Sequence, residues 1–161
     1  MAQDHVDVPR GPGVVVPPPL IFVATLALGV AIDHFVTQWT TLVPAIARYL
    51  LAALLCLAGI ALIGSAVGLF RRAGTRPEPW QASSALVLDG VYRFTRNPMY
   101  LGMGAIYAAL ALILDSAMSL LLGIPLILLI QRAVIAREER YLLVRFGDDY
   151  RRYMSRVRRW I

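Results

Sequence analysis

The chain has 161 residues, 58% of them hydrophobic and 16% charged, with a formal net charge of +6 at pH 7. Its mean hydropathy is +0.64. Soluble domains are less apolar and their apolar runs are broken by charge, so this composition excludes an ordinary soluble domain. We therefore expect an all-α integral membrane protein with about four transmembrane helices.

Residues 1–18 form a leader rich in glycine and proline. We expect this leader to be flexible, because proline lacks a backbone donor and fixes φ. A secretory signal peptide is the competing interpretation. However, the leader carries acidic residues and the following apolar run has no clear small-residue cleavage site. We therefore favour a first membrane helix from Pro19 to Val36.

Three further windows contain no charged residue: those between Arg48 and Arg71, between Arg96 and Asp115, and between Asp115 and Arg132. They predict helices over residues 45–70, 98–114 and 116–136. A helix needs roughly 20 residues to cross about 30 Å of hydrocarbon, so the first of these spans easily and the other two span tightly. We expect the last two to form a hairpin at Asp115, and we expect Pro125 to kink the fourth helix.

The arginines predict the orientation. All sixteen basic residues are arginine, and fourteen of them follow the second helix, in residues 71–96 or 132–159. Because loops rich in Lys and Arg stay in the cytoplasm, we expect a bundle at 19–136 with a cytoplasmic loop at 71–97, and a cytoplasmic amphipathic tail at 137–161. Both termini and the active site then face the cytoplasm, in what we expect to be a prokaryotic inner membrane.

The positive charge does not require a nucleic-acid partner. Membrane topology and anionic head groups both favour arginine beside helices, at about 1 kcal/mol per residue, and no nucleic-acid motif accompanies the arginines. Cys56 is the single cysteine, and His5 and His34 are far apart in sequence. We therefore expect no disulfide framework, metal site or histidine triad. The membrane lipid is the expected environment, and the oligomeric state stays open.

The densest polar cluster precedes the third helix, in the sequence YRFTRNPMYLG at 92–102. Asn97 and Pro98 are typical of a helix start, as N-cap and first helical residue. The free N–H groups there and two arginines favour an anion, whereas two tyrosine faces favour a cation. These side chains are Arg93, Arg96, Tyr92 and Tyr100. A zwitterion fits the mixture, although Tyr and Arg also serve simply as interfacial anchors.

Glu138 and Glu139 follow the fourth helix. Helical spacing lets at least one of them point back toward the bundle. On spacing alone, we favour exposed pairs with nearby arginines, worth about 0–1 kcal/mol. We expect Gly147 to end this helix and Asp148 or Asp149 to cap another. The apolar stripe of that last helix either anchors on the leaflet or covers the site as a lid. The stripe consists of Tyr150, Tyr153, Met154, Val157 and Ile161.

The sequence RNPMYLG at 96–102, a hydrophobic hairpin and then Glu138-Glu139 resemble a known pattern. It is the RHPxYxG, hydrophobic stretch, EE pattern of the isoprenylcysteine carboxyl methyltransferases and the related membrane phospholipid methyltransferases. The sequence DGVYR at 89–93 and the Phe-Gly pair at 146–147 extend the resemblance. It covers the chain from about Ala73 onward.

The resemblance implies S-adenosylmethionine as cofactor, S-adenosylhomocysteine as product, and no metal. The cofactor is a zwitterion with a sulfonium, and the tail is expected to complete its site. The implied cofactor-binding residues are Val87, Leu88, Gly90, Tyr92, Arg96, Asn97, Pro98, Tyr100, Gly102 and Glu138. The implied catalytic residues are Glu138, Glu139, Arg96 and Tyr100. By analogy, Arg96 meets the anionic end, Tyr100 lies near the sulfonium, and one glutamate meets the ammonium, a ribose hydroxyl or the substrate.

The implied reaction is methyl transfer to an apolar or lipid-like acceptor. O-methylation of an isoprenylcysteine carboxylate is favoured, and a lipid, an isoprenoid acid or a small apolar thiol stay open. A carboxylate acceptor needs no general base, whereas a hydroxyl or amine would use a glutamate or Tyr100. Asn97 stands where better-known members carry histidine. Its amide can hold a group but cannot titrate, so no histidine-dependent step carries over.

Two other functions are weighed against the methyltransferase. A small transporter protomer would need an ionisable group inside the membrane, and Asp33 is the candidate. Its neighbours His34 and Gln38 place it at an edge, which argues against transport. A non-enzymatic membrane anchor is the other alternative. It predicts that the arginine, tyrosine and glutamates of the motif can all be replaced without loss.

Overall fold

The computed structural model describes residues 11–14, 16–76, 78 and 83–161, and every regular element among them is helical. This confirms the all-α prediction. Residues 1–10, most of the expected leader, lie outside the described residues. The elements in chain order are α1 (Pro18–Ile32), η1 (Asp33–Thr37), α2 (Ala45–Arg72), η2 (Gly90–Arg93), α3 (Pro98–Ile113), α4 (Ala117–Leu129), η3 (Ile130–Ile135) and α5 (Ala136–Arg156).

Three helical stretches among the described residues are long and apolar enough to cross a membrane: Pro18–Thr37, Ala45–Arg72 and Ala117–Arg156. The apolar helix α3 has 16 residues, or about 24 Å at the usual rise of about 1.5 Å per residue, which is short for the full hydrocarbon thickness. The chain is therefore an integral membrane protein with three long apolar helices and a shorter fourth, in agreement with the predicted count.

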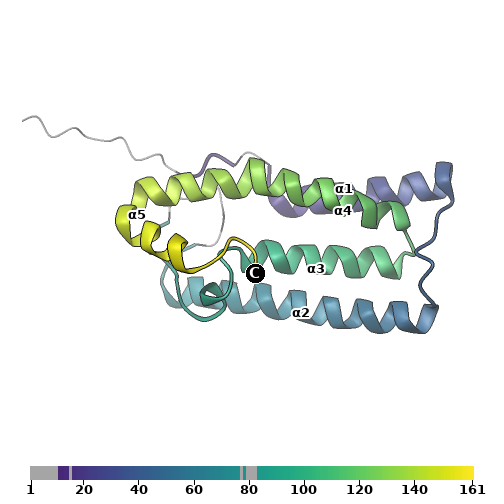
Figure 1. Ribbon diagram of the computed structural model, residues 1–161, viewed down its shortest axis with the longest axis horizontal. Helices are drawn as coiled ribbons and strands as arrows, with labels where there is room; N and C mark the ends of the chain where they lie inside the picture. The colour runs from purple at the N-terminus through teal and green to yellow at the C-terminus, as the bar shows by residue number, and fades with distance from the viewer. Residues whose placement is uncertain (1–10, 15, 77, 79–82) are drawn as a thin grey trace, which may run out of the picture.

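The four helices form two side-by-side pairs, with α1 next to α4 and α2 next to α3 (Figure 1). Glycines set the distance between α2 and α3. A Cβ added to Gly59 would lie 2.7 Å from the carbonyl oxygen of Gly102, and one added to Gly102 would lie 2.7 Å from Ile63 Cγ1. Small residues let membrane helices approach closely, and close packing drives their association in lipid.

The hairpin between α3 and α4 turns at Asp115, as predicted, with φ at +53°. Its carboxylate forms an ion pair with Arg48 and accepts bonds from the backbone N–H of Thr41 at 3.0 Å and its hydroxyl at 2.6 Å. Hydrogen bonding to Arg48 and Thr41 lowers the pKa of Asp115. Ser116 caps α4 by accepting from the N–H of Ser119. This tight corner fixes the register of the two helices.

The candidate transporter residue, Asp33, belongs to the same end of the bundle. Its Oδ1 accepts from Thr37 at 2.7 Å, and its Oδ2 accepts from Ser116 Oγ at 2.5 Å and from the N–H of Met118 at 2.9 Å. Oδ2 therefore holds the end of α1 against the start of α4, and Oδ1 bonds within η1. This is a structural role, because hydrogen bonds satisfy a buried carboxylate and join two helices.

The fourth helix runs further than predicted. The expected end at Ala136 is wrong, because α4 continues through the π-helical η3 into α5. Pro125 lies inside α4, and the kink expected there stays a prediction. The predicted end at Gly147 is confirmed: this residue has φ 51° and ψ −122° inside α5, and the helix direction changes there. The yellow end of the chain then turns back toward the start of α3 (Figure 1).

Candidate functional site

The motif loop is held at one end of the bundle by a short turn. The 3₁₀ helix η2 ends at Arg93 and leads to Pro98, the first residue of α3. Asn97 occupies the N-cap position, as predicted, but its side chain makes no cap hydrogen bond. The expected capping role of that side chain is therefore wrong, and its amide is free for another partner.

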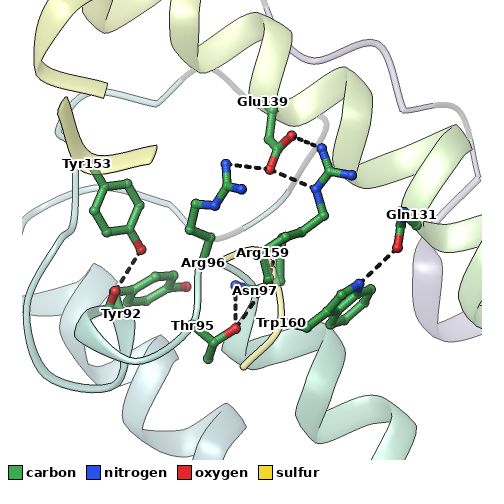
Figure 2. A network of polar contacts seen from close by, with 9 residues as sticks. All are labelled: Tyr92, Thr95, Arg96, Asn97, Gln131, Glu139, Tyr153, Arg159 and Trp160. Carbon is green, nitrogen blue, oxygen red and sulfur yellow. Dashed lines mark hydrogen bonds and ion pairs between the residues drawn. The ribbon is translucent and has the colours of Figure 1, made fainter. Parts of the chain in front are cut away.

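Glu139 lies at the centre of the cluster. Its Oε1 is 2.9 Å from Arg96 Nη1 and accepts from Arg159 Nε at 3.1 Å, and its Oε2 pairs with Arg159 Nη2. Glu139 is 6% exposed, so the preferred prediction of exposed glutamates is wrong here. Hydrogen bonding to Glu139 raises the pKa of Arg159. Figure 2 shows both guanidinium groups pointing at this one carboxylate.

Arg96 has unused hydrogen-bonding capacity. Its side chain is 11% exposed, and among the described residues its Nε and Nη1 atoms have no hydrogen-bond partner, although Nη1 lies in ion-pair range of Glu139. A buried donor without an acceptor is costly and is rare in folded proteins. The Nε atom of Arg96 therefore marks a place where a ligand acceptor fits.

Glu138 also points inward. The hydroxyl of Tyr100 donates a hydrogen bond to Glu138 Oε1, and Tyr100 is 6% exposed. The structure thus brings together all four predicted catalytic residues: Arg96 with Glu139, and Tyr100 with Glu138. The two pairs carry different formal charge. Glu139 meets two guanidinium groups and Glu138 meets a neutral phenol, so the cluster has a positive side and a negative side.

The strap, residues 157–161, lies across the motif loop. The N–H of Arg96 donates to the carbonyl of Arg158 at 3.0 Å. The carbonyl of Arg159 accepts from the Asn97 amide at 2.8 Å and from the Thr95 hydroxyl at 3.2 Å. Trp160 Nε1 donates to Gln131 Oε1 at 2.9 Å (Figure 2). The strap therefore joins the loop before α3 to the η3–α5 segment.

Buried aromatic rings close one side of the cluster. Tyr153 donates from its hydroxyl to the carbonyl of Tyr92 at 2.7 Å, and Tyr92 packs edge-to-face on Phe70 at 5.8 Å between ring centroids. Burial raises the pKa of Tyr92, so this phenol stays neutral at physiological pH. The tail helix therefore packs its tyrosines against η2 and α2, and its role as a lid stays a prediction. The stripe does not reach Ile161, because α5 ends at Arg156 and Ile161 is 78% exposed.

Two cavities lie next to the cluster. One, of about 640 Å³, is lined by residues that include Leu88, Tyr153 and Arg156. The other, of about 520 Å³, is almost wholly apolar, and Tyr100 and Trp160 are among its lining residues. Tyr100 therefore contacts the apolar cavity with its ring and Glu138 with its hydroxyl.

The other predicted cofactor-binding residues occupy more varied positions. Val87 and Leu88 are half-buried and pack with Tyr92 in the aromatic group. Pro98 is buried at the start of α3. Gly90, with φ +58°, faces Leu69 of α2, and Gly102 faces α2 as described above. The structure thus gives both glycines packing roles, and their contact with a cofactor stays a prediction.

Arg159, Trp160 and Gln131 were not predicted as site residues. Arg159 and Trp160 lie beyond the change of direction at Gly147, so no helical spacing from the fourth helix relates them to Glu139 or Gln131. A basic residue in a basic tail carries no distinguishing signal. Gln131 lies about two turns before the glutamate pair, and its spacing to Glu138 was the one available indication.

Comparison with known proteins identifies the family. Residues 47–149 match the family model of the phospholipid methyltransferases. The chain belongs to this membrane methyltransferase family. The family resemblance read from the motif is therefore confirmed, and the match includes the motif loop, Glu138 and Glu139.

One curated relative has no assigned activity. The chain is 48% identical over 63 residues to an uncharacterized protein of Haemophilus influenzae, which corresponds to 39% of this chain and 100% of that protein. No solved structure matches the chain. The family membership therefore rests on the sequence match, and the arrangement of the site rests on the structure described above.

Proposed function

We propose that the protein is an S-adenosylmethionine-dependent membrane methyltransferase that methylates an apolar or lipid-like acceptor. The observation that carries the proposal is the two-sided charge of the motif cluster. Arg96 and Arg159 outnumber their shared partner Glu139, whereas Glu138 has a phenol and, among the described residues, no cation as its partner. A zwitterion that carries a carboxylate and cationic groups matches such a site.

The residues present fit this cofactor. Arg96 Nε, which has no hydrogen-bond partner among the described residues, suits a carboxylate, which accepts charge-assisted hydrogen bonds. Glu138 suits the ammonium or a ribose hydroxyl, and the tyrosine rings suit a sulfonium. The cavity beside Leu88 and Tyr153 gives room for the remainder of the molecule. When bound, S-adenosylmethionine supplies an electrophilic methyl group.

The chain's own residues would act mainly by orientation. Arg96 would hold the cofactor carboxylate, Glu138 would hold the ammonium or a ribose hydroxyl, and the buried tyrosines would exclude water. Alignment of the reacting groups and exclusion of water supply most of the acceleration of a displacement reaction. A carboxylate acceptor requires no proton transfer. For a hydroxyl or amine acceptor, Glu138 would take the proton. The hydroxyl of Tyr100 donates to Oε1 of Glu138 and would keep the carboxylate oriented.

The apolar cavity supports an apolar acceptor. It adjoins Tyr100, so a ligand with its chain in the cavity would place its head group near Glu138. A prenylated cysteine carboxylate has this form, and we favour it over a lipid hydroxyl or amine or an apolar thiol because a carboxylate needs no base. An isoprenoid acid shares this property and stays the alternative acceptor. The distribution of arginines supports a cytoplasmic site and cytoplasmic termini, in a prokaryotic inner membrane.

The test is calorimetric titration of S-adenosylmethionine into the detergent-purified protein. We expect saturable binding by the wild type. We expect Glu138→Gln to weaken binding about tenfold, because it removes a formal charge and keeps the shape and a partner for Tyr100. Asp148→Asn is the control, since it likewise replaces a carboxylate by an amide, at an exposed side chain outside the motif cluster. No binding by folded wild type from micromolar to millimolar cofactor would overturn the proposal.

A further inference from the structure

The strap contacts the motif loop and Glu139 through the carbonyls of Arg158 and Arg159 and through the Arg159 side chain. Its carbonyls accept from the loop through the Arg96 N–H, the Thr95 hydroxyl and the Asn97 amide. Its Arg159 side chain engages both oxygens of Glu139. The strap therefore contacts the loop on one side and the glutamate of α5 on the other, which are the two halves of the motif.

Asn97 has one described side-chain partner, the carbonyl of Arg159 at 2.8 Å. It is 7% exposed, and its backbone N–H bonds to Thr95 Oγ1. A buried amide whose donor is used by the strap holds the strap in place rather than a ligand. This explains why asparagine suffices at this position, because the bond needs an N–H donor and no titration.

Arg159 determines what Arg96 can offer to a ligand. A carboxylate facing one guanidinium tends to pair with it through both oxygens. Here Arg159 takes both oxygens of Glu139, and Arg96 is left with one ion-pair contact to Glu139, a contact with Tyr150, and an Nε atom that has no hydrogen-bond partner among the described residues. Without Arg159, Glu139 is free to turn fully to Arg96 and to occupy Nε.

We propose that Asn97 and Arg159 are positioning residues: Asn97 docks the strap, and the docked strap places Arg159 on Glu139, which keeps Arg96 available for the cofactor carboxylate. This inference rests on the proposed function for the identity of the ligand. The docking itself is a property of the protein alone and is measured separately.

The docking is measured by tryptophan fluorescence. The variant Trp39→Phe/Trp80→Phe leaves Trp160, at the strap, as the single tryptophan. In this background we expect Asn97→Leu to shift the Trp160 emission to the red, because the indole leaves its partly buried site beside Gln131. We expect Asn97→His to retain the wild-type emission, because an imidazole N–H can donate to the same carbonyl. Equal emission from the Leu and His variants would overturn the docking role.

The effect on the site is measured by titration of S-adenosylmethionine. We expect Asn97→Leu and Arg159→Gln to weaken binding about tenfold, and Asn97→His to restore it, with little change in melting temperature for Arg159→Gln. Arg158→Gln is the matched control, because that side chain is exposed on the same strap and binding should not change. Unchanged binding by Arg159→Gln, beside a wild type that binds, would overturn the inference and leave the proposed function intact. If the wild type itself fails to bind, the proposed function fails, and the emission data alone decide the docking.

Discussion

The two ends of the bundle both contain carboxylates and arginines, but they use them differently. At the α3–α4 corner, Arg48 pairs with Asp115 one to one, and Asp33 is held by hydroxyl and amide donors. At the motif end, two arginines share Glu139, and Glu138 meets a phenol. The first arrangement gives each carboxylate its own partners and joins helices. The second places two guanidinium groups on one carboxylate and a phenol on the other, so that opposite formal charges lie on different sides of one cluster, which is what a zwitterionic ligand requires.

Burial does not distinguish the two ends. Asp33 is 8% exposed and Glu139 is 6% exposed, and each end includes a buried arginine Nε without a described hydrogen-bond partner, in Arg48 and in Arg96. A cavity adjoins each end, since one of about 460 Å³ is lined by residues that include Asp33 and Asp115. The difference lies in how the charges are paired and in the almost wholly apolar cavity beside Tyr100 and Trp160. A polar cluster in a membrane protein therefore becomes a site candidate through the pairing of its charges and an adjoining apolar cavity.

The largest expected effect separates Arg96 from Arg48. We expect Arg96→Gln to weaken binding of S-adenosylmethionine by about 100-fold, because charged hydrogen bonds contribute about 1.5–3 kcal/mol each and Arg96 Nε has no hydrogen-bond partner among the described residues. Arg48→Gln should leave cofactor affinity unchanged and lower the melting temperature. Titration calorimetry and thermal unfolding of both variants check this. Equal loss of cofactor binding in the two would remove the functional distinction between the ends.

A smaller effect should appear at Ser116, in stability alone. Ser116→Ala removes the cap of α4 and one donor to Asp33. We expect a loss of about 1–2 kcal/mol in unfolding free energy, which is typical of a lost N-cap, with unchanged cofactor affinity. Thermal unfolding in detergent and titration calorimetry measure the two quantities. A weakened cofactor affinity here would show that the corner is coupled to the site.

The smallest effect is the pH dependence of the corner. Because hydrogen bonds from Arg48 and Thr41 lower the pKa of Asp115, its contribution to stability is fully present above the ordinary carboxyl pKa of about 4. That contribution decreases as the pH falls from there through the lowered value. Asp115→Asn should therefore show a weaker decrease in melting temperature below pH 4 than the wild type. Parallel pH profiles for the two proteins would contradict this assignment.

The sequence predicted most of the fold and the membership of the site, but not how the site is connected. The uncharged windows located the helices, because an apolar run of sufficient length has few other stable environments. The motif located Arg96, Tyr100, Glu138 and Glu139. Helical spacing, however, favoured exposed glutamates, because spacing describes one helix and contains no information about a neighbouring segment that folds back onto it.

The sequence by itself determined a helical membrane protein of the phospholipid methyltransferase family, because hydrophobic length and a spaced motif are local properties of the chain. The tertiary structure decided which partner each charge takes. The reversal at Gly147 brings the strap to the motif loop, so that Arg159 shares Glu139 with Arg96 and Asn97 binds the strap rather than capping its helix. These pairings depend on residues about 20 to 62 positions apart, which only the packed fold brings together.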